Sequence, residues 1–240
     1  PEPLEEHLSD LSNEVTAQRA DLGIAVDPDV DRLVFIDENG LFFGEEYTLV
    51  ACADYILKKE KGPIVSNLSS SRALADLAND YDVNYHASAI GELHVVNKMK
   101  EVKALIGGEG NGGVILPALH YGRDALVGIA LFLSHIANEN IRVSKLKERY
   151  TSYVMYKKKI DLSSSWNADA LLDTIATTFE DARVTKIDGV KIDFDDSWIH
   201  LRKSNTEPII RLYAEAKSLD NIKAKIEKIE AVIAEFVASV

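Results

Sequence analysis

The order of apolar segments along the chain is the feature that most constrains its fold. Short apolar runs that predict strands alternate with longer segments whose apolar residues recur at helical spacing. The predicted strands cover 22–26, 32–37, 63–67, 83–90 and 103–108, and the predicted helices cover 44–60, 70–80, 91–101 and 123–138. Strands of about five residues that alternate with helices of ten or more indicate βαβ units and a mainly parallel sheet.

Beyond about residue 150 the pattern changes to closely spaced strands. The predicted strands there cover 152–162, 182–187, 189–194, 197–204 and 208–216, with a helix over 167–179. The chain ends in a helical pattern that places Ile222, Ile226, Ile229 and Ile233 on one face. We therefore expect an α/β protein in which a mixed, mainly parallel α/β domain is followed by a smaller α+β domain.

Charge and cysteine content exclude several classes of function. The formal net charge of −12 argues against a nucleic-acid partner or an anionic membrane partner, since either favours a basic face. The single cysteine, Cys52, excludes an internal disulfide and a cysteine-based zinc site, and we expect it to be buried in a helix. Because no run of eighteen apolar residues and no basic-then-apolar leader is present, the sequence predicts a cytoplasmic protein.

The segment "AVDPDVDRLVFID" carries three aspartates at alternate positions, followed at once by an arginine. In an extended segment Asp27, Asp29 and Asp31 lie on the same side. Three carboxylates suit Mg²⁺, which fills its remaining coordination positions with phosphate or water. Arg32 then suits a phosphate held beside the same metal. The segment therefore predicts a magnesium site next to a phosphate.

Three other interpretations fit parts of this segment. A calcium-binding EF-hand loop also begins with three alternating aspartates and would place Glu38 at its twelfth position, but it needs glycine where Arg32 stands. An aspartyl-phosphate phosphatase would use Asp27 as nucleophile, but its motif continues to Thr or Val where this chain has Asp31. A solvated acidic turn is the third interpretation, and the flanking apolar strands disfavour it.

Two further loops carry polar groups suited to a sugar phosphate. "GGEGNGG" (107–113) follows a predicted strand, and its Glu109 and Asn111 suit the vicinal hydroxyls of a sugar. "RKSNTEPIIR" (202–211) lies between two predicted strands and concentrates cationic and neutral donors in an otherwise acidic chain. Guanidinium groups with several directed donors suit a phosphate dianion. The donors in question are Arg202, Ser204, Asn205, Thr206 and Arg211.

These three loops, in this order, resemble those of the α-D-phosphohexomutases, the family of phosphoglucomutase, phosphomannomutase and phosphoglucosamine mutase. "DPDVDR" is similar to the family's D-x-D-x-D-R metal loop, and "GEGNGG" is similar to its G-E-x-S-G sugar loop. "RKSNTEP" is similar to its R-x-S-[GN]-T-E-P phosphate loop. The resemblance covers the whole chain.

The resemblance implies an isomerase that moves a phosphate between the 1- and 6-hydroxyls of a hexose, through an enzyme phosphoserine and a sugar 1,6-bisphosphate. It implies that Asp27, Asp29 and Asp31 hold Mg²⁺ and that Arg32 is a catalytic residue that steadies the phosphoserine. It further implies that Glu109 and Asn111 bind the sugar. The unreacting phosphate would be held by Arg202, Ser204, Asn205, Thr206 and Arg211.

Two departures from the family pattern bear on activity. Asn111 stands where the family commonly has Ser, which leaves the choice among glucosamine, mannose and glucose phosphates open. No T-A-S-H-N type loop, which carries the family's nucleophile, occurs in the chain. We therefore expect the C-terminal portion of a mutase whose upstream N-terminal domains supply the phosphoserine, and we expect this chain to be inactive alone.

The resemblance also predicts how the chain is divided. Residues 1–38 would end the second mutase domain, 39–145 would form the third, and 146–240 would form the fourth. The alternative function is a non-catalytic phosphosugar-binding fragment, and the phosphatase is a third. Glu92 and His94 are candidate cleft residues, and the sequence does not identify the general acid or base.

Overall fold

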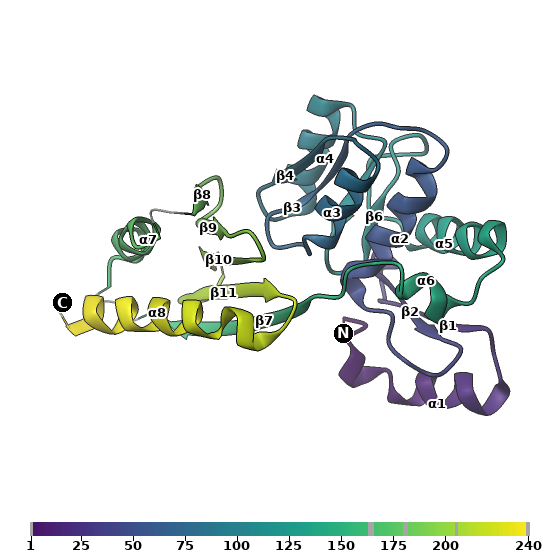
Figure 1. The fold of residues 1–240 in the computed structure, drawn as a ribbon, viewed down its shortest axis with the longest axis horizontal. Helices are drawn as coiled ribbons and strands as arrows, with labels where there is room; N and C mark the ends of the chain where they lie inside the picture. The colour runs from purple at the N-terminus through teal and green to yellow at the C-terminus, as the bar shows by residue number, and fades with distance from the viewer. Residues whose placement is uncertain (1, 163–165, 180–181, 205, 239–240) are drawn as a thin grey trace. The chain divides into compact units, whose positions relative to one another are not determined.

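The computed structural model describes residues 2–162, 166–179, 182–204 and 206–238. The chain divides into two compact units, Pro1–Thr151 and Ser152–Val240 (Figure 1). None of the helices in the described ranges combines the length and the apolarity that a membrane span requires.

A four-stranded sheet in the order β4-β3-β5-β6 forms the centre of the first unit. Its strands are β3 (Ile64–Asn67), β4 (Tyr85–Ser88), β5 (Ile106–Glu109) and β6 (Gly113–Ile115). The first three are parallel, whereas β6 turns back to pair antiparallel with β5. Every residue of β3, β5 and β6 is buried, as expected for strands covered on both faces.

Helices cover both faces of this sheet. The helices of the unit are η1 (Glu5–His7), α1 (Ser9–Gln18), α2 (Glu45–Leu57), α3 (Ala73–Asp80), α4 (Glu92–Val102), α5 (Ala125–Glu139) and α6 (Val143–Lys147). A Cβ at Gly107 would meet Met99 of α4, and one at Gly108 would meet Leu49 of α2. Because neighbouring strand residues face opposite sides, α4 and α2 cover opposite faces.

A separate pair of antiparallel strands, β1 (Leu22–Val26) and β2 (Leu33–Asp37), packs against α1. Strand β2 is fully buried and also contacts α2 and α5. Residues 27–32, which carry the three aspartates and the arginine, connect the two strands. The packing of β2 therefore fixes one end of the aspartate loop to the core.

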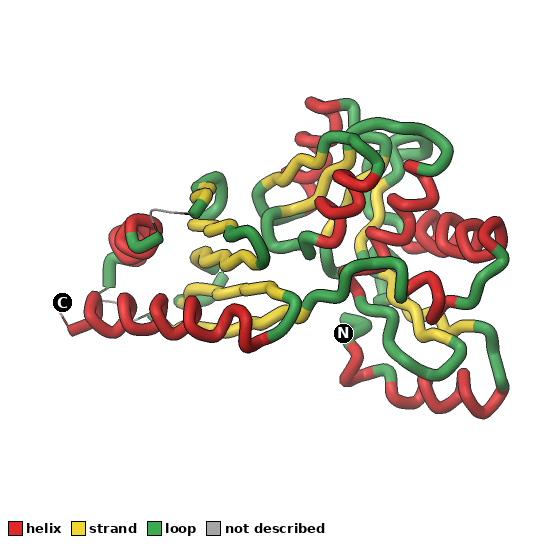
Figure 2. The backbone as a smooth tube through the Cα atoms, viewed as in Figure 1, coloured by secondary structure: helices red, strands yellow, loops and turns green. Residues whose placement is uncertain are grey.

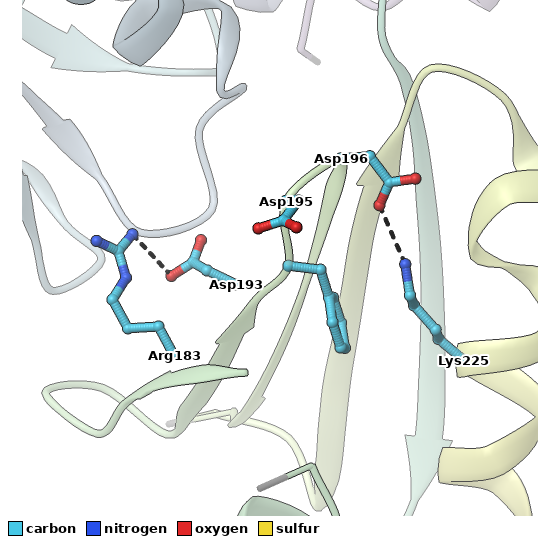
Figure 3. Close-up of a pocket in the computed structure, with 6 residues that line it drawn as sticks. Arg183, Asp193, Asp195, Asp196 and Lys225 are labelled. Carbon is cyan, nitrogen blue, oxygen red and sulfur yellow. Dashed lines mark hydrogen bonds and ion pairs between the residues drawn. The ribbon is translucent and has the colours of Figure 1, made fainter. Parts of the chain in front are cut away.

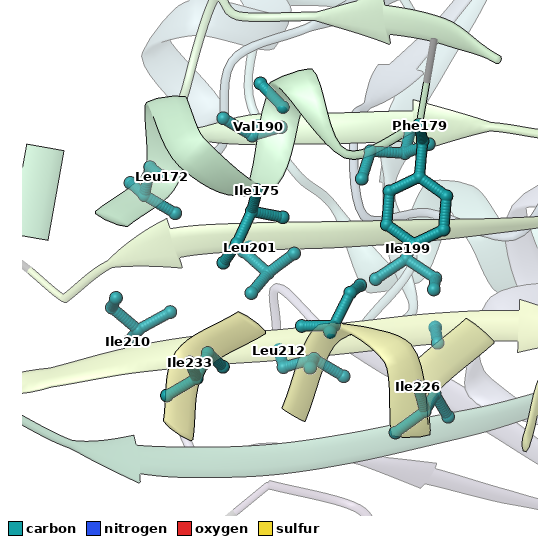
Figure 4. Packing of buried hydrophobic residues seen from close by; sticks show 14 of the residues in the cluster. Leu172, Ile175, Phe179, Val190, Ile199, Leu201, Ile210, Leu212, Ile226 and Ile233 are labelled. Carbon is teal, nitrogen blue, oxygen red and sulfur yellow. The ribbon is translucent and has the colours of Figure 1, made fainter. Parts of the chain in front are cut away.

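The second unit is a five-stranded antiparallel sheet with both helices on one face (Figures 2 and 4). The strand order is β7-β11-β10-β9-β8. The elements are β7 (Val154–Asp161), α7 (Ala168–Thr177), β8 (Arg183–Thr185), β9 (Val190–Asp193), β10 (Ser197–Lys203), β11 (Ile209–Ala216) and α8 (Leu219–Ala238). The four isoleucines predicted to share one face of the last helix are all buried in this core.

The expected fold class is confirmed, because a mixed, mainly parallel α/β unit is followed by an α+β unit. Cys52 is buried in α2, as predicted, and burial raises the pKa of its thiol. The sequence patterns missed β6, α1 and α6. Strand β6 has three residues, two of them apolar, which is too short for a periodic signal.

His200 makes the stability of the chain depend on pH. It lies on β10, is fully buried, and its Nε2–H donates to the carbonyl of Asp188 at 2.6 Å. Burial lowers the pKa of His200 from 6.5 to about 4. The unfolded chain therefore takes up a proton below pH 6.5 that the folded chain does not take up until about pH 4.

We expect the free energy of unfolding to fall by about 3 kcal/mol on this account between pH 6.5 and pH 4, at ~1.36 kcal/mol per pKa unit. Urea unfolding at several pH values measures it. The variant His200→Gln should show a shallower fall over that range, whereas His7→Gln, which replaces an exposed histidine, should match the wild type. Equal slopes for His200→Gln and the wild type would contradict this prediction.

Candidate functional site

The aspartate loop closes on Asp27 through hydrogen bonds from its own backbone. Asp27 Oδ1 accepts from the amides of Asp31 (3.0 Å) and Arg32 (3.1 Å), and the Asp27 carbonyl accepts from the Val30 amide. Val30 has a φ of +58°, a left-handed conformation that is unusual for a β-branched residue. The prediction that the segment is extended is therefore wrong, because the carboxylates are gathered by a turn.

The turn nevertheless brings the three predicted ligands together. One carboxylate oxygen from each of Asp27, Asp29 and Asp31 lies within 4.8 Å of the others. Such a set of hard oxygen donors has the chemistry and spacing to hold one divalent cation.

The electrostatics of these carboxylates fit a cation. Burial raises the pKa of Asp31, and the neighbouring negative charge of Asp27 raises it further. Burial also acts to raise the pKa of Asp27, but the amides of Arg32 and Asp31 and the side chain of Asp31 outweigh it, so the pKa is lowered. Asp31 Oδ1 is buried and has no hydrogen-bond partner among the described residues. A cation would satisfy that oxygen and remove the repulsion between the carboxylates.

Arg32 lies beside this cluster and is already paired. Its Nε is 3.6 Å from Asp27 Oδ2, and its Nη1 forms an ion pair with Glu2. Its side chain is 24% exposed. Arg32 therefore offsets part of the negative charge of the loop. For the whole guanidinium of Arg32 to bind a phosphate, its ion pair with Glu2 would have to break.

Glu109, the predicted sugar ligand, lies at the end of β5 and is buried. Its Oε1 accepts from Asn67 Nδ2 (3.0 Å) and from the amide of Gly91 (3.2 Å), and its Oε2 accepts from Arg123 Nη1 (2.9 Å). Asn111 is half-buried, and its Oδ1 accepts from the amide of Gly113 in the same turn. Both side chains are therefore held in fixed orientations.

Backbone hydrogen bonds tie the Glu109 loop to the first residue of β2 and the aspartate loop to the first residue of α5. The amide of Leu33 donates to the carbonyl of Gly112 (3.1 Å), and the amide of Ala125 donates to the carbonyl of Val30 (3.1 Å). Gly112 has a φ of +89°, and a Cβ there would overlap the Leu33 carbonyl. The close approach of the Glu109 loop to the start of β2 therefore requires glycine at residue 112.

The sequence interpretation missed Arg123. Its guanidinium forms ion pairs with Asp31, with Glu109 Oε2 (2.9 Å) and with Glu92 Oε2 (3.3 Å). The signal that could have found it is its position just before Asp124, which caps α5 by accepting from the Val127 amide. Glu92, a candidate cleft residue, is thus part of the same cluster.

The predicted phosphate residues lie in the second unit, around the connection between β10 and β11. Arg202 and Arg211 stand opposite each other on these paired strands. Arg202 Nε is 3.3 Å from Asp188 Oδ2, and Arg211 Nη2 is 2.7 Å from Glu207 Oε2. Ser204 Oγ accepts from the amides of Thr206 (3.4 Å) and Glu207 (3.3 Å). Asn205 lies outside the described residues.

A pocket of about 740 Å³ in the second unit is a separate feature (Figure 3). Its lining residues are Arg183, Asp193, Phe194, Asp195, Asp196 and Lys225. Arg183 pairs with Asp193 and Lys225 pairs with Asp196, so both cations are compensated. The acidic lining is unsuited to a phosphate dianion, and none of the described residues of the predicted phosphate loop contributes to it.

Domains of one enzyme family match nearly the whole chain. Residues 44–153 match the phosphoglucomutase/phosphomannomutase alpha/beta/alpha domain III, and residues 166–235 match the C-terminal domain of the same family. Residues 1–40 match its alpha/beta/alpha domain II. The chain belongs to the phosphohexomutase family.

Individual phosphohexomutases are similar over almost all of these residues. The phosphoglucomutase/phosphomannomutase of Thermococcus kodakarensis is 36% identical over 95% of the chain and 50% of its own length. The phosphoglucosamine/phosphogalactosamine mutase of Sulfurisphaera tokodaii is 33% identical over 95% of the chain and 52% of its own length. The chain thus spans about half the length of these relatives.

A solved structure has the same phosphohexomutase fold. The crystal structure of a phosphoglucomutase/phosphomannomutase family protein from Burkholderia thailandensis aligns with a TM-score of 0.79 and 25% identity. The alignment covers 98% of this chain and 50% of that one.

Proposed function

We propose that this chain forms the metal-, sugar- and phosphate-binding part of an enzyme that interconverts hexose 1-phosphates and 6-phosphates. The observation that carries the proposal is that one guanidinium, that of Arg123, forms ion pairs with both Asp31 of the three-aspartate loop and Glu109. A cation ligand set and a carboxylate suited to sugar hydroxyls thereby share one site. In the same proposal, residues 1–38, 39–145 and 146–240 correspond to the end of the second, the third and the fourth mutase domains.

The residues have distinct roles in this proposal. Asp27, Asp29 and Asp31 hold Mg²⁺, which when bound supplies positive charge against the transferring phosphoryl group. Arg32 donates to the phosphate of the enzyme phosphoserine. Glu109 and Asn111 bind hydroxyls of the hexose. The phosphate that does not react is bound by Arg202, Ser204, Asn205, Thr206 and Arg211.

Catalysis by such a site comes mainly from positioning and from charge stabilisation. The fixed orientation of Glu109, which accepts three hydrogen bonds, supports this view because it presents the same oxygens to each substrate. A sugar 1,6-bisphosphate is the intermediate. It must reorient within the site so that each of its two phosphates can in turn face the phosphoserine. The relatives named above make glucosamine, mannose and glucose phosphates the candidate substrates.

The phosphoserine is proposed to come from upstream domains of the same protein. Two observations support this: the chain has no T-A-S-H-N type loop, and it spans about half the length of its relatives. The absent nucleophile loop also favours a second candidate, in which this chain alone binds phosphosugars without catalysis. A phosphatase that uses Asp27 is disfavoured, because its motif continues to Thr or Val where this chain has Asp31.

A coupled mutase assay on the 240-residue chain tests the proposal. The assay supplies glucosamine, mannose and glucose 1-phosphates in turn, with Mg²⁺ and a trace of the sugar 1,6-bisphosphate. We expect no turnover by this chain, and turnover when the chain is joined to the upstream domains. Turnover by the chain alone would contradict the inference that the chain lacks a nucleophile. Ser69, Ser70 and Ser71 would then be the candidate nucleophiles. No turnover by the joined protein with any of the three substrates would overturn the mutase proposal.

A further inference from the structure

Arg123 is joined by ion pairs to both the aspartate loop and the Glu109 loop. Its three carboxylate partners come from three places: Asp31 between β1 and β2, Glu109 at the end of β5, and Glu92 at the start of α4. The Arg123 side chain is 14% exposed, so these pairs are screened by solvent less than surface pairs are. Its planar group of five N–H donors suits several carboxylates at once.

The backbone and stem of Arg123 are also fixed. Its amide donates to Glu92 Oε1 at 3.2 Å, and it directly precedes Asp124, the N-cap of α5. The side-chain stem occupies the space beside Gly113, where a Cβ would overlap the Arg123 Cδ. The guanidinium therefore reaches the carboxylates from a defined direction.

The position of the Arg123 guanidinium determines which carboxylate oxygen of Asp31 is available to a cation. Arg123 Nη2 donates to Asp31 Oδ2, and the other oxygen, Oδ1, is the buried atom that has no hydrogen-bond partner in the described part of the chain. A side chain that grips one oxygen of a carboxylate restricts its rotation and so directs the second oxygen. Groups that orient metal ligands in this way typically contribute about 10- to 100-fold to metal affinity.

The same guanidinium donates to Glu109 Oε2. We propose that Arg123 is a positioning residue that couples the cation site to the sugar site, by orienting Asp31 and Glu109 together. The proposal rests on the proposed function, since it assigns a cation to the aspartate loop and a sugar to Glu109. The proposal adds that the affinity of the aspartate loop for a cation depends on Glu109. Arg123 mediates this dependence, because it pairs with both Glu109 and Asp31.

Binding of Mn²⁺ to the 240-residue chain, measured by electron paramagnetic resonance, tests the proposal without any need for turnover. We expect Arg123→Gln to bind Mn²⁺ about 10- to 100-fold more weakly than the wild type. The matched control is Arg149→Gln, which loses an arginine–carboxylate pair to Glu139 (2.8 Å) outside the site. It should bind Mn²⁺ as the wild type does.

A double-mutant cycle separates coupling through Arg123 from the simple loss of a negative charge. Glu109→Gln alone should weaken Mn²⁺ binding by at least about twofold, and it should have no further effect in the Arg123→Gln background. Should Arg123→Gln fail to fold, Gly113→Ala replaces it, because the added Cβ displaces the Arg123 stem without changing any charge. Gly113→Ala should also weaken Mn²⁺ binding.

The outcomes distinguish this proposal from the proposed function. Failure of the wild-type chain to bind Mn²⁺ would overturn the cation site and the coupling with it. Wild-type binding together with unchanged binding by Arg123→Gln or by Gly113→Ala would overturn the role of Arg123 alone. An equal effect of Glu109→Gln in both backgrounds would overturn the coupling, because the charge of Glu109 would then act independently of Arg123.

Discussion

Replacing Asp27 by asparagine is expected to lower the affinity of the chain for Mn²⁺ or Mg²⁺ by about 100-fold or more, since a direct ligand should matter at least as much as the groups that orient it. Asparagine keeps the side-chain oxygen that accepts from the amides of Asp31 and Arg32, so the turn can still close. What disappears is one negative charge, that of the buried Asp27. The loss of affinity therefore reports cation binding and not the collapse of the loop.

The matched control for this prediction is Asp37→Asn. Asp37 is also buried and also closes a turn, where its Oδ1 accepts from the amides of Asn39 (2.8 Å) and Leu41 (2.9 Å), but it does not belong to the aspartate cluster. Its replacement should leave cation affinity unchanged. Isothermal titration calorimetry gives both affinities, and the rise in melting temperature on addition of Mg²⁺ should be lost in Asp27→Asn alone. Equal affinities for Asp27→Asn and the wild type would contradict the assignment of the metal ligands.

The largest expected loss of stability follows from replacing Asp54 by alanine. Asp54 lies on α2, is buried, and accepts hydrogen bonds from the hydroxyls of Tyr81 (2.5 Å) and Tyr150 (2.9 Å). Burial raises the pKa of both tyrosines, and the nearby Asp54 raises it further, so both phenols stay protonated and donate. Removal of the carboxylate leaves two sheltered hydroxyls without this acceptor, at a cost of about 1–3 kcal/mol each.

We therefore expect Asp54→Ala to lower the free energy of unfolding by about 3–5 kcal/mol, measured by urea unfolding at pH 7. Asp54→Asn keeps one acceptor oxygen and should lose roughly half as much. Asp80→Ala, which removes an exposed aspartate at the end of α3, should change stability by no more than about 0.5 kcal/mol. A loss below about 1 kcal/mol for Asp54→Ala would show that the tyrosines find other partners.

The parts of the fold that the sequence predicts are those with a periodic apolar pattern. Strands β3 and β5 were predicted because short apolar runs alternate with helical segments, and α8 was predicted from isoleucines that recur at helical spacing. Strand β6 was missed because a three-residue strand next to glycines has no period to detect. Its existence depends on pairing with β5, which is a tertiary contact.

The site was predictable to a different extent. Residue types and spacing indicated that Asp27, Asp29 and Asp31 converge, but the structure gathers them by a turn closed on Asp27 and not by strand alternation. The position of Arg123 just before the N-cap Asp124 does not reveal its ion pairs, because its partners Asp31, Glu92 and Glu109 come from distant parts of the sequence. Ion pairs of this kind are visible only once the chain has folded.

The hydrogen bonds from Leu33 to Gly112 and from Ala125 to Val30 have a consequence for the order of folding. They close large loops of the chain, and contacts between residues so far apart in sequence carry a high entropic cost and tend to form late. We therefore expect the contacts that hold the aspartate turn in place to form only after β5, β6 and α5 have formed. We expect a bound cation to slow unfolding and to leave the rate of folding nearly unchanged, since we expect its binding site to be completed only after the transition state.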